Sequence, residues 1–222
     1  MNLWMYSSEE GQENESMDED LCLEIFSKKP VFTFIPAHSD DAEVCYDSFI
    51  ERFSPYAAIN FRMLDPEGRV TKADIRSLKS SDLIYLSGGN TFHFLKNLRV
   101  SGLLETIRNF AKAGGLLAGH SAGAILMTPH IRTAAIPDFD RDHNNVGIKN
   151  ILAMRLCRFE FFPHYEDIPE YSEVLEFASV NGTLPIYSVE DGCGIVVNEK
   201  GLRFYGDAWV FYRGAKVKIS VY

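Results

Sequence analysis

The chain has 222 residues, of which 46% are apolar and 24% charged, and its formal net charge is −9. This size and balance predict one globular domain over residues 1–222 rather than a disordered or fibrous protein. An acidic chain without a basic stripe excludes nucleic acid as a partner, and the lack of a long apolar run excludes a membrane span.

The N-terminal segment is a short apolar stretch followed by acid. Met1–Tyr6 has no basic leader, so we do not interpret it as a secretory signal. Glu9–Asp20 then carries much of the negative charge. We interpret this acidic run as a solvated loop that aids solubility.

The first half of the chain alternates short apolar runs with helical patterns. The predicted strands are Leu3–Tyr6, Val31–Pro36, Ala58–Met63, Leu83–Leu86 and Leu116–Ala118. Asp40 followed by Glu43 predicts a helix start, with apolar residues at helical spacing as far as Phe53. Thr91–Asn97 and Gly102–Ala113 predict two further helices. This alternation indicates an α/β fold, a doubly wound and mostly parallel sheet with helices on both faces.

The second half is less regular. Ile131–Gly147 is polar and aperiodic, which predicts a long loop of functional importance. An apolar run at Arg155–Phe162 and a helix at Pro169–Asn181 follow it. From Leu184 onward, short strands alternate with glycine turns at 191–192, 200–201 and 213–214. No repeat, linker or second domain is apparent.

The cysteines indicate the compartment. All four stand far apart and none forms a CxxC pair: Cys22, Cys45, Cys157 and Cys193. This spacing favours free core thiols over a disulfide frame or a zinc site. We therefore expect a cytoplasmic protein.

One segment has the pattern of a turn that presents a nucleophile. Residues 116–124, LLAGHSAGA, combine a buried strand, the string G-x-S-x-G and the start of a helix. At such a turn the serine backbone is strained and its hydroxyl is exposed above the sheet edge, while the flanking glycines avoid a clash. The helix N-terminus lets the N–H of Ala122 stabilise an oxyanion. We predict Ser121 as the nucleophile.

A second strand ends in a glycine turn, in residues 83–91, LIYLSGGNT. Adjacent glycines let backbone N–H groups approach a ligand closely. The carboxyl edge of a neighbouring strand is where a second oxyanion donor should lie. Gly88, Gly89 and Asn90 are therefore predicted to bind the oxyanion or the substrate, although a plain tight turn has the same pattern.

A general base is the next requirement, and the chain has six histidines. His164 follows the apolar run Phe159–Pro163, so it lies at a strand end from which a side chain reaches the sheet edge. His120 adjoins the nucleophile but is expected to form a wall of the site. The others are interpreted as incidental: His38, His93, His130 and His143.

The base needs an acidic partner that fixes its tautomer. Asp191 and Glu190 follow the predicted strand Pro185–Val189 and are the best placed. Asp191 is our first choice, although Asp-Gly is also a common hairpin turn. Weaker candidates lie on the long loop: Asp138, Asp140 and Asp142.

Taken together, these segments resemble the peptidase E family, the aspartyl dipeptidases related to cyanophycinases, which share the class I glutamine amidotransferase-like fold. The motifs that carry the resemblance are Ser87-Gly88-Gly89-Asn90-Thr91-Phe92, Gly119-His120-Ser121-Ala122-Gly123-Ala124, Pro163-His164-Tyr165 and Ala208-Trp209-Val210-Phe211. The resemblance places the family's nucleophile on Ser121, its histidine on His164 and its third triad member on Asp191. It places the oxyanion donors on Gly89 and Ala122.

Two segments differ from the family's pattern. Ile131-Arg132-Thr133 is followed by Ala134-Ala135-Ile136, where the family has an Asn-Asp pair. The family's arginine-containing loop after the histidine is replaced here by Tyr165–Glu170, which has three acidic residues and no arginine. An acidic loop repels an aspartyl carboxylate. Asp-X specificity is therefore not expected to carry over.

The resulting prediction is a serine peptidase that hydrolyses small peptides through an acyl-enzyme, as a monomer or homodimer. This chemistry implies no cofactor, neither a metal ion nor an organic group. One alternative is an esterase of the α/β-hydrolase type, which uses the same turn. The other is a non-catalytic relative that binds a small ligand at the same place.

Overall fold

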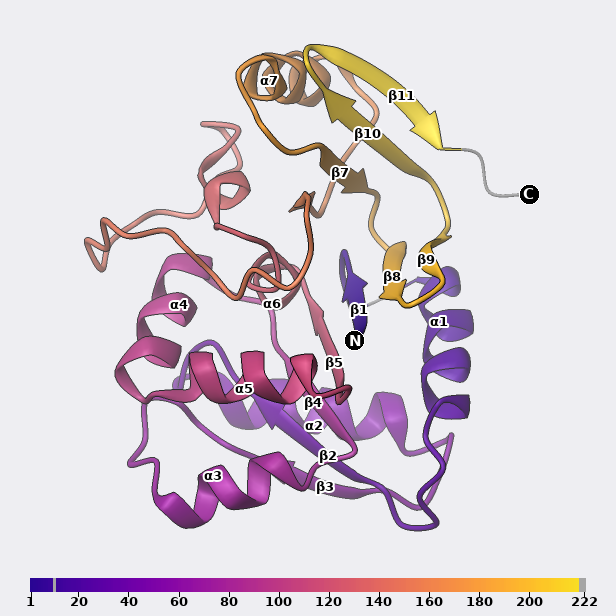
Figure 1. Cartoon of the computed structure of the whole chain (residues 1–222), viewed down its shortest axis with the longest axis vertical. Helices are drawn as coiled ribbons and strands as arrows, with labels where there is room; N and C mark the ends of the chain where they lie inside the picture. The colour runs from indigo at the N-terminus through magenta and orange to yellow at the C-terminus, as the bar shows by residue number, and fades with distance from the viewer. Residues whose placement is uncertain (10, 220–222) are drawn as a thin grey trace.

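A seven-stranded sheet forms the centre of the molecule. The computed structural model describes residues 1–9 and 11–219 (Figure 1). The strand order is β3-β2-β4-β5-β1-β8-β9, and the first five of these strands run parallel. They are β1 (Asn2–Tyr6), β2 (Val31–Ile35), β3 (Asn60–Met63), β4 (Leu83–Leu86) and β5 (Leu116–His120), followed by the antiparallel β8 (Gly194–Asn198) and β9 (Gly201–Tyr205). The predicted α/β fold class is confirmed.

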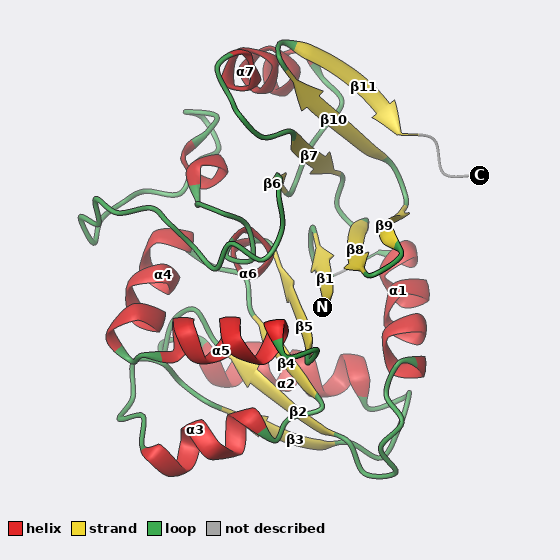
Figure 2. Ribbon diagram, viewed as in Figure 1, coloured by secondary structure: helices red, strands yellow, loops and turns green. Residues whose placement is uncertain are grey.

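Side chains alternate between the two faces of this sheet, and the two faces differ in chemistry. Trp4 and Tyr6 pack on one face with other aromatic side chains, whereas Leu3 and Met5 pack on the other with mainly aliphatic ones. Helices α1 (Gln12–Leu23) and α2 (Ala42–Phe53) cover the aromatic face. The aliphatic face is covered by α3 (Lys72–Lys79), α4 (Thr91–Val100) and α5 (Leu103–Lys112) (Figure 2).

A second, smaller sheet lies above the carboxyl edge of the first (Figure 1). Its order is β11-β10-β7-β6, with β6 and β7 parallel and the other pairs antiparallel. These strands are β6 (Glu160–Phe162), β7 (Ile186–Val189), β10 (Ala208–Tyr212) and β11 (Ala215–Ile219). Helix α7 (Pro169–Val180) packs against this sheet through a separate aromatic cluster that includes Tyr165 and Trp209.

The predicted strands of the first half are all present, and their ends differ from the predicted ends by two residues at most. The predicted helices and the tail of short strands are confirmed in the same way. The long loop is also present, apart from a short 3-10 helix at Arg132–Ala135. Helix α3, which begins with a capping box at Thr71 and Asp74, was not predicted. No helix in the described ranges has both the length and the apolarity that crossing a membrane requires.

The interpretation of Glu9–Asp20 as a solvated loop was wrong, because most of it belongs to α1. Residue 10 of this run lies outside the described residues. Met17 and Leu21 are fully buried, and Asp18, only 3% exposed, binds the guanidinium of Arg52 at 2.6 and 2.8 Å. Composition could not reveal this, because the charge that compensates Asp18 comes from α2.

Candidate active site

Three neighbouring strands of the large sheet end at the candidate site. Strand β5 lies between β4 and β1, so the residues that follow these strands meet at one edge. Ser7 follows β1, the turn at residues 87–89 follows β4, and Ser121 follows β5. The amide N–H of Ser121 donates to the carbonyl of Tyr6 at 3.1 Å, which ties the end of β5 to β1.

Ser121 has the strained backbone that the sequence predicts. Its φ is 49° and its ψ is −115°, a conformation that costs a side-chain-bearing residue about 1–3 kcal/mol. The helix α6 (Ala122–Ile125) starts immediately afterwards. A Cβ on Gly119 would lie 2.9 Å from the carbonyl oxygen of Leu86, and one on Gly123 would lie only 2.4 Å from it. Both glycines are therefore required for this turn to pack on β4.

His164 and Asp191 reach Ser121 from the small sheet, from loops that follow β6 and β7. Nε2 of His164 lies 2.9 Å from Oγ of Ser121, and its Nδ1 lies 2.6 Å from Oδ1 of Asp191. The structure thus brings together the three predicted catalytic residues. Glu190, the alternative acid, has no hydrogen bond to His164 in the described part of the chain. The His164 and Asp191 side chains are 42% and 63% exposed, so solvent reaches the pair.

Ser7, a residue that the sequence pattern does not single out, connects these groups. Ser7 is fully buried, and its Oγ accepts a hydrogen bond from the amide N–H of His164 at 2.7 Å. The same hydroxyl lies 3.2 Å from Oδ1 of Asp191. Ser7 therefore positions both the base and the acid. Its place directly after a parallel strand is the signal that could have identified it.

The turn after β4 has two glycines with different functions. The Gly88 amide donates to Nε2 of His120 at 2.8 Å, so this N–H is already engaged. Gly89 has a φ of 121° and a Cβ there would lie 2.9 Å from the Cβ of Ala37. The described residues provide no acceptor for the amides of Gly89 or Ala122. These two N–H groups are therefore available to an oxyanion.

Asn90, also predicted to bind substrate or oxyanion, is engaged in local structure. Its side-chain oxygen accepts the amide N–H of His93 at 3.0 Å and so caps α4. Its Nδ2 donates to the carbonyl of His143 at 3.0 Å on the long loop. Asn90 thus has a structural contact at each end of its side-chain amide, unlike Gly89, whose amide is available to an oxyanion.

His120 supports the glycine turn, in addition to lining the site as predicted. Burial, together with nearby Arg52 and then His164, lowers its pKa to about 3. Nε2 accepts from Gly88, so the neutral ring carries its proton on Nδ1, which lies 3.4 Å from Oε1 of Glu9. Protonation of Nε2 would remove the acceptor of the Gly88 N–H and bring two N–H donors face to face. The turn therefore requires the neutral form.

This requirement predicts acid sensitivity. Because the folded pKa of His120 is about 3, below the ordinary value of about 6.5, only the unfolded chain takes up a proton as the pH falls below 6.5. The contribution of neutral His120 to the free energy of unfolding is complete above that pH. It decreases towards pH 3 by about 1.4 kcal/mol per pH unit. In His120→Gln, whose amide oxygen can still accept from Gly88, we expect the loss of stability between pH 6.5 and 4.5 to shrink by about 2 kcal/mol.

Urea unfolding at the two pH values measures this difference. His143→Gln is the matched control, because His143 is exposed on the long loop and should leave the acid sensitivity of the wild type unchanged. An equal loss in His120→Gln and in the wild type would contradict the role of His120.

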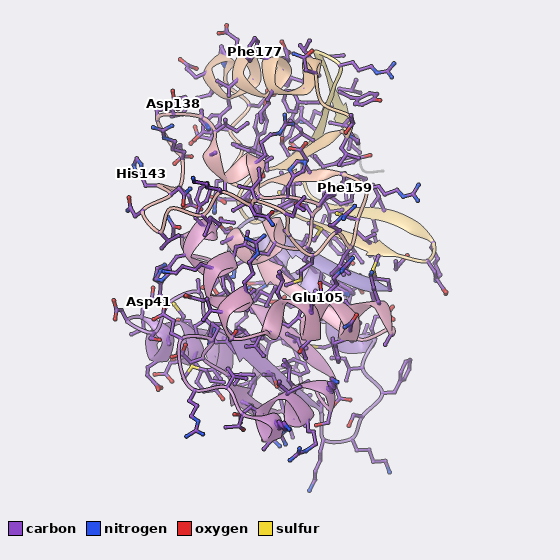
Figure 3. All side chains as sticks on the ribbon, turned by 60° about the vertical axis from the view of Figure 1, so that its left-hand side comes forward. Asp41, Glu105, Asp138, His143, Phe159 and Phe177 are labelled. Atoms are coloured by element: carbon purple, nitrogen blue, oxygen red, sulfur yellow. The ribbon has the colours of Figure 1, made fainter. Side chains whose placement is uncertain are left out.

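A cleft of about 740 Å³ opens beside Ser121 and His164. The long loop forms one wall of it, and the segment after His164 forms another. In Figure 3 the loop residues Asp138 and His143 lie along one edge of the molecule, with Asp41 further along the same edge. Six carboxyl groups line this cleft: Asp140, Asp142, Glu166, Asp167, Glu190 and Asp191. Arg141 is the single lysine or arginine in the described lining, and it pairs with Asp138 at 2.7 Å.

Four of the six carboxylates already have partners within the protein. Asp140 accepts from the hydroxyl of Tyr171, Asp142 from the amide of Thr91, Asp167 from Nζ of Lys216, and Asp191 pairs with His164. Neither Glu166 nor Glu190 has a side-chain partner among the described residues. Burial and then Asp207 raise the pKa of Glu190. With six carboxylates and one arginine in its described lining, the cleft carries an excess of negative charge.

A second hollow of about 530 Å³ shares Ser121, His164 and Asp191 with the first. It also contains Gly89, one of the two available amide donors. Its described lining has the acidic residues Glu9, Asp41 and Asp191 and has no lysine or arginine. Both hollows beside the candidate nucleophile are therefore negatively charged.

Several known proteins resemble this chain in sequence. A sequence model of Peptidase family S51 matches residues 3–205. An uncharacterized peptidase of Listeria monocytogenes is 36% identical over 117 residues, which cover 51% of this chain and 56% of the relative. A protein named peptidase E from Salmonella arizonae is 31% identical over 152 residues, 64% of each chain. The chain thus spans about half to two thirds of the length of these relatives.

Two solved structures have the same fold over nearly the whole chain. The crystal structure of a putative peptidase E protein from Listeria monocytogenes has a TM-score of 0.71 and 26% identity, and it covers 91% of this chain and 96% of that one. A peptidase from an acI-B1 actinobacterium has a TM-score of 0.73 and covers 99% of this chain and 93% of that one. At 17% identity, the second comparison concerns the fold alone.

Proposed function

The chain belongs to peptidase family S51, and from this membership we propose that it is a serine peptidase that cleaves small peptides through an acyl-enzyme. The observation that carries the proposal is the hydrogen-bonded series from Ser121 Oγ through the His164 imidazole to the Asp191 carboxylate, at 2.9 and 2.6 Å. The strained turn at Ser121 supports it, because strain in a non-glycine residue is typical of functional sites. Membership of this peptidase family also argues against the alternative of an α/β-hydrolase esterase.

The proposed reaction has two halves. Ser121 Oγ attacks the peptide carbonyl while His164 Nε2 takes the hydroxyl proton, and Asp191 stabilises the imidazolium through Nδ1–H. The amides of Gly89 and Ala122 stabilise the oxyanion. The C–N bond breaks as His164 returns the proton to the leaving amine, which leaves an ester on Ser121. Water, deprotonated by the same imidazole, then hydrolyses the ester and regenerates the hydroxyl.

We further propose that the preferred substrates are positively charged peptides, such as those with an N-terminal lysine or arginine. The support is the excess of carboxylates in both hollows, and above all the unpaired Glu166 and Glu190. An aspartyl side chain would enter a field of its own sign, which costs binding energy. The absence of an arginine from Tyr165–Glu170 has the same consequence.

A dipeptide panel tests both proposals. We expect kcat/KM for Lys-X and Arg-X to exceed that for Asp-X by at least about 10-fold, which corresponds to 1.4 kcal/mol. The double variant Glu166→Gln/Glu190→Gln should lower this ratio of kcat/KM values. High salt should lower the ratio in the wild type as well, because it screens the carboxylates. Glu199→Gln, on the distant turn after β8, is the control that should preserve the ratio.

The outcomes separate the two proposals. Equal turnover of all dipeptides would overturn the charge preference and leave the peptidase proposal intact. Failure of the wild type to cleave any dipeptide would count against the peptidase proposal itself.

We propose that residues 1–222 form one peptidase domain that functions in the cytoplasm. The four cysteines support a reducing compartment, since none of them forms a disulfide in the described part of the chain. Cys193 is buried as predicted for core thiols, whereas Cys22, Cys45 and Cys157 are partly exposed.

A further inference from the structure

Two histidines and a glutamate meet beside the glycine turn that follows β4. His38 lies in the loop after β2, Glu67 in the loop after β3, and His93 in the first turn of α4. Nδ1 of His93 lies 2.6 Å from Nδ1 of His38, and Nε2 of His93 lies 3.2 Å from Oε1 of Glu67. One potential ligand atom from each residue lies within 4.8 Å of the other two.

We infer that His38, Glu67 and His93 form a binding site for a divalent transition-metal ion of the Zn²⁺ type. Two imidazoles and one carboxylate are a donor set that such ions favour over Mg²⁺ or Ca²⁺. A tetrahedral ion with bonds of about 2.1 Å separates its ligand atoms by about 3.4 Å. Nδ1 of His93 lies 3.2 Å from Nε2 of His38, which is close to that value, and the carboxylate of Glu67 faces the other nitrogen of the His93 ring. Rotation of the side chains would therefore bring one ligand atom from each residue, now within 4.8 Å of the other two, to the spacing that an ion requires.

The surrounding residues orient the ligands. Nδ2 of Asn97, a residue only 7% exposed, donates to Oε1 of Glu67 at 2.7 Å and to the carbonyl of Ala37 at 3.1 Å. Oε1 of Glu67, the oxygen that lies 3.2 Å from Nε2 of His93, is thereby held in place beside the imidazole. The cap from Asn90 fixes the backbone at His93. Such outer hydrogen bonds are typical of metal sites. The His93 and Glu67 side chains are 27% and 30% exposed, so an ion can enter from solvent.

The site is distinct from the candidate active site but borders the glycine turn. A Cβ built on Gly89 would lie 2.9 Å from Ala37 and 3.6 Å from the His38 ring. A bound ion would therefore link the loops after β2 and β3 to α4, directly behind Gly89. Because an ion that binds only the folded chain stabilises it, Zn²⁺ should raise the melting temperature.

Calorimetric titration of the chelator-treated protein with Zn²⁺ tests the inference. We expect one site in the wild type, with affinity at least about 10-fold weaker in His93→Gln and in Glu67→Gln. His143→Gln and His164→Gln are matched controls that should retain the site, and the second also excludes binding by His164 and Asp191. Circular dichroism verifies that each variant is folded.

A second measurement does not depend on affinity. Co²⁺ in a site with tetrahedral nitrogen and oxygen ligands has visible d–d absorption bands, which we expect in the wild type and in His143→Gln but not in His93→Gln. Absence of stoichiometric binding by the wild type would overturn the inference. So would unchanged Zn²⁺ affinity in both folded ligand variants.

Discussion

Ser121→Ala is expected to lower kcat for peptide hydrolysis by at least about 10⁴-fold, because the acyl-enzyme cannot form without the hydroxyl. The fold should be retained. Oγ has its hydrogen bond with the solvent-exposed His164, and alanine can occupy the same strained backbone as serine. The remaining rate would come from the oxyanion donors and from binding. Initial rates on the best dipeptide of the panel, with melting temperatures as the check on folding, measure the effect.

Covalent labelling distinguishes this enzyme from a non-catalytic relative that binds a ligand at the same site. A fluorophosphonate probe requires an activated serine, so it should modify wild-type Ser121 and leave Ser121→Ala unlabelled. Mass spectrometry of the labelled peptide identifies the residue. An unlabelled wild-type serine, or full activity in Ser121→Ala, would be incompatible with the proposed nucleophile.

Asp191→Asn is expected to lower kcat by about 10²–10³-fold. The asparagine amide would donate to Nδ1 of His164, and this selects the tautomer with the proton on Nε2, which cannot accept from Ser121. The effect should be smaller than for a fully buried acid, because 63% of the Asp191 side chain is exposed and water can partly replace it. Steady-state kinetics on a neutral dipeptide isolate this step from the binding of charged substrates.

Glu190, the acid next to Asp191 in the chain, provides a matched comparison. Glu190→Gln removes a carboxylate one residue away that has no hydrogen bond to His164 among the described residues. Its kcat on the same neutral dipeptide should therefore decrease far less than that of Asp191→Asn. If the two effects came in the reverse order, the third catalytic role would belong to Glu190.

The buried acid in α1 shows what residue patterns alone cannot predict. Asp18 belongs to an acidic run that looked fully solvated, and it is nevertheless buried with Arg52 and accepts from the hydroxyl of Tyr6 at 2.8 Å. These three residues come from α1, α2 and β1. A local pattern contains no information about a compensating charge that arrives from a different part of the chain.

Elements whose signals are local could be predicted from the residue pattern. The turn at Ser121 could be predicted because strand, glycines, serine and helix start occur within nine consecutive residues, 116–124. The turn at Gly88 and Gly89 and the parallel strands were predictable for the same reason, since a glycine turn and a short apolar run are each visible in neighbouring residues.

The way in which distant segments combine is visible only in the folded chain. The fold divided the strands between two sheets and thereby brought His164 and Asp191, from the small sheet, to Ser121 at the edge of the large one. It also placed Ser7 between the base and the acid, and brought His38 and His93 together. Such pairings depend on strand order and on how the sheets pack, and residues far apart in the chain acquire their partners only when the whole chain has folded.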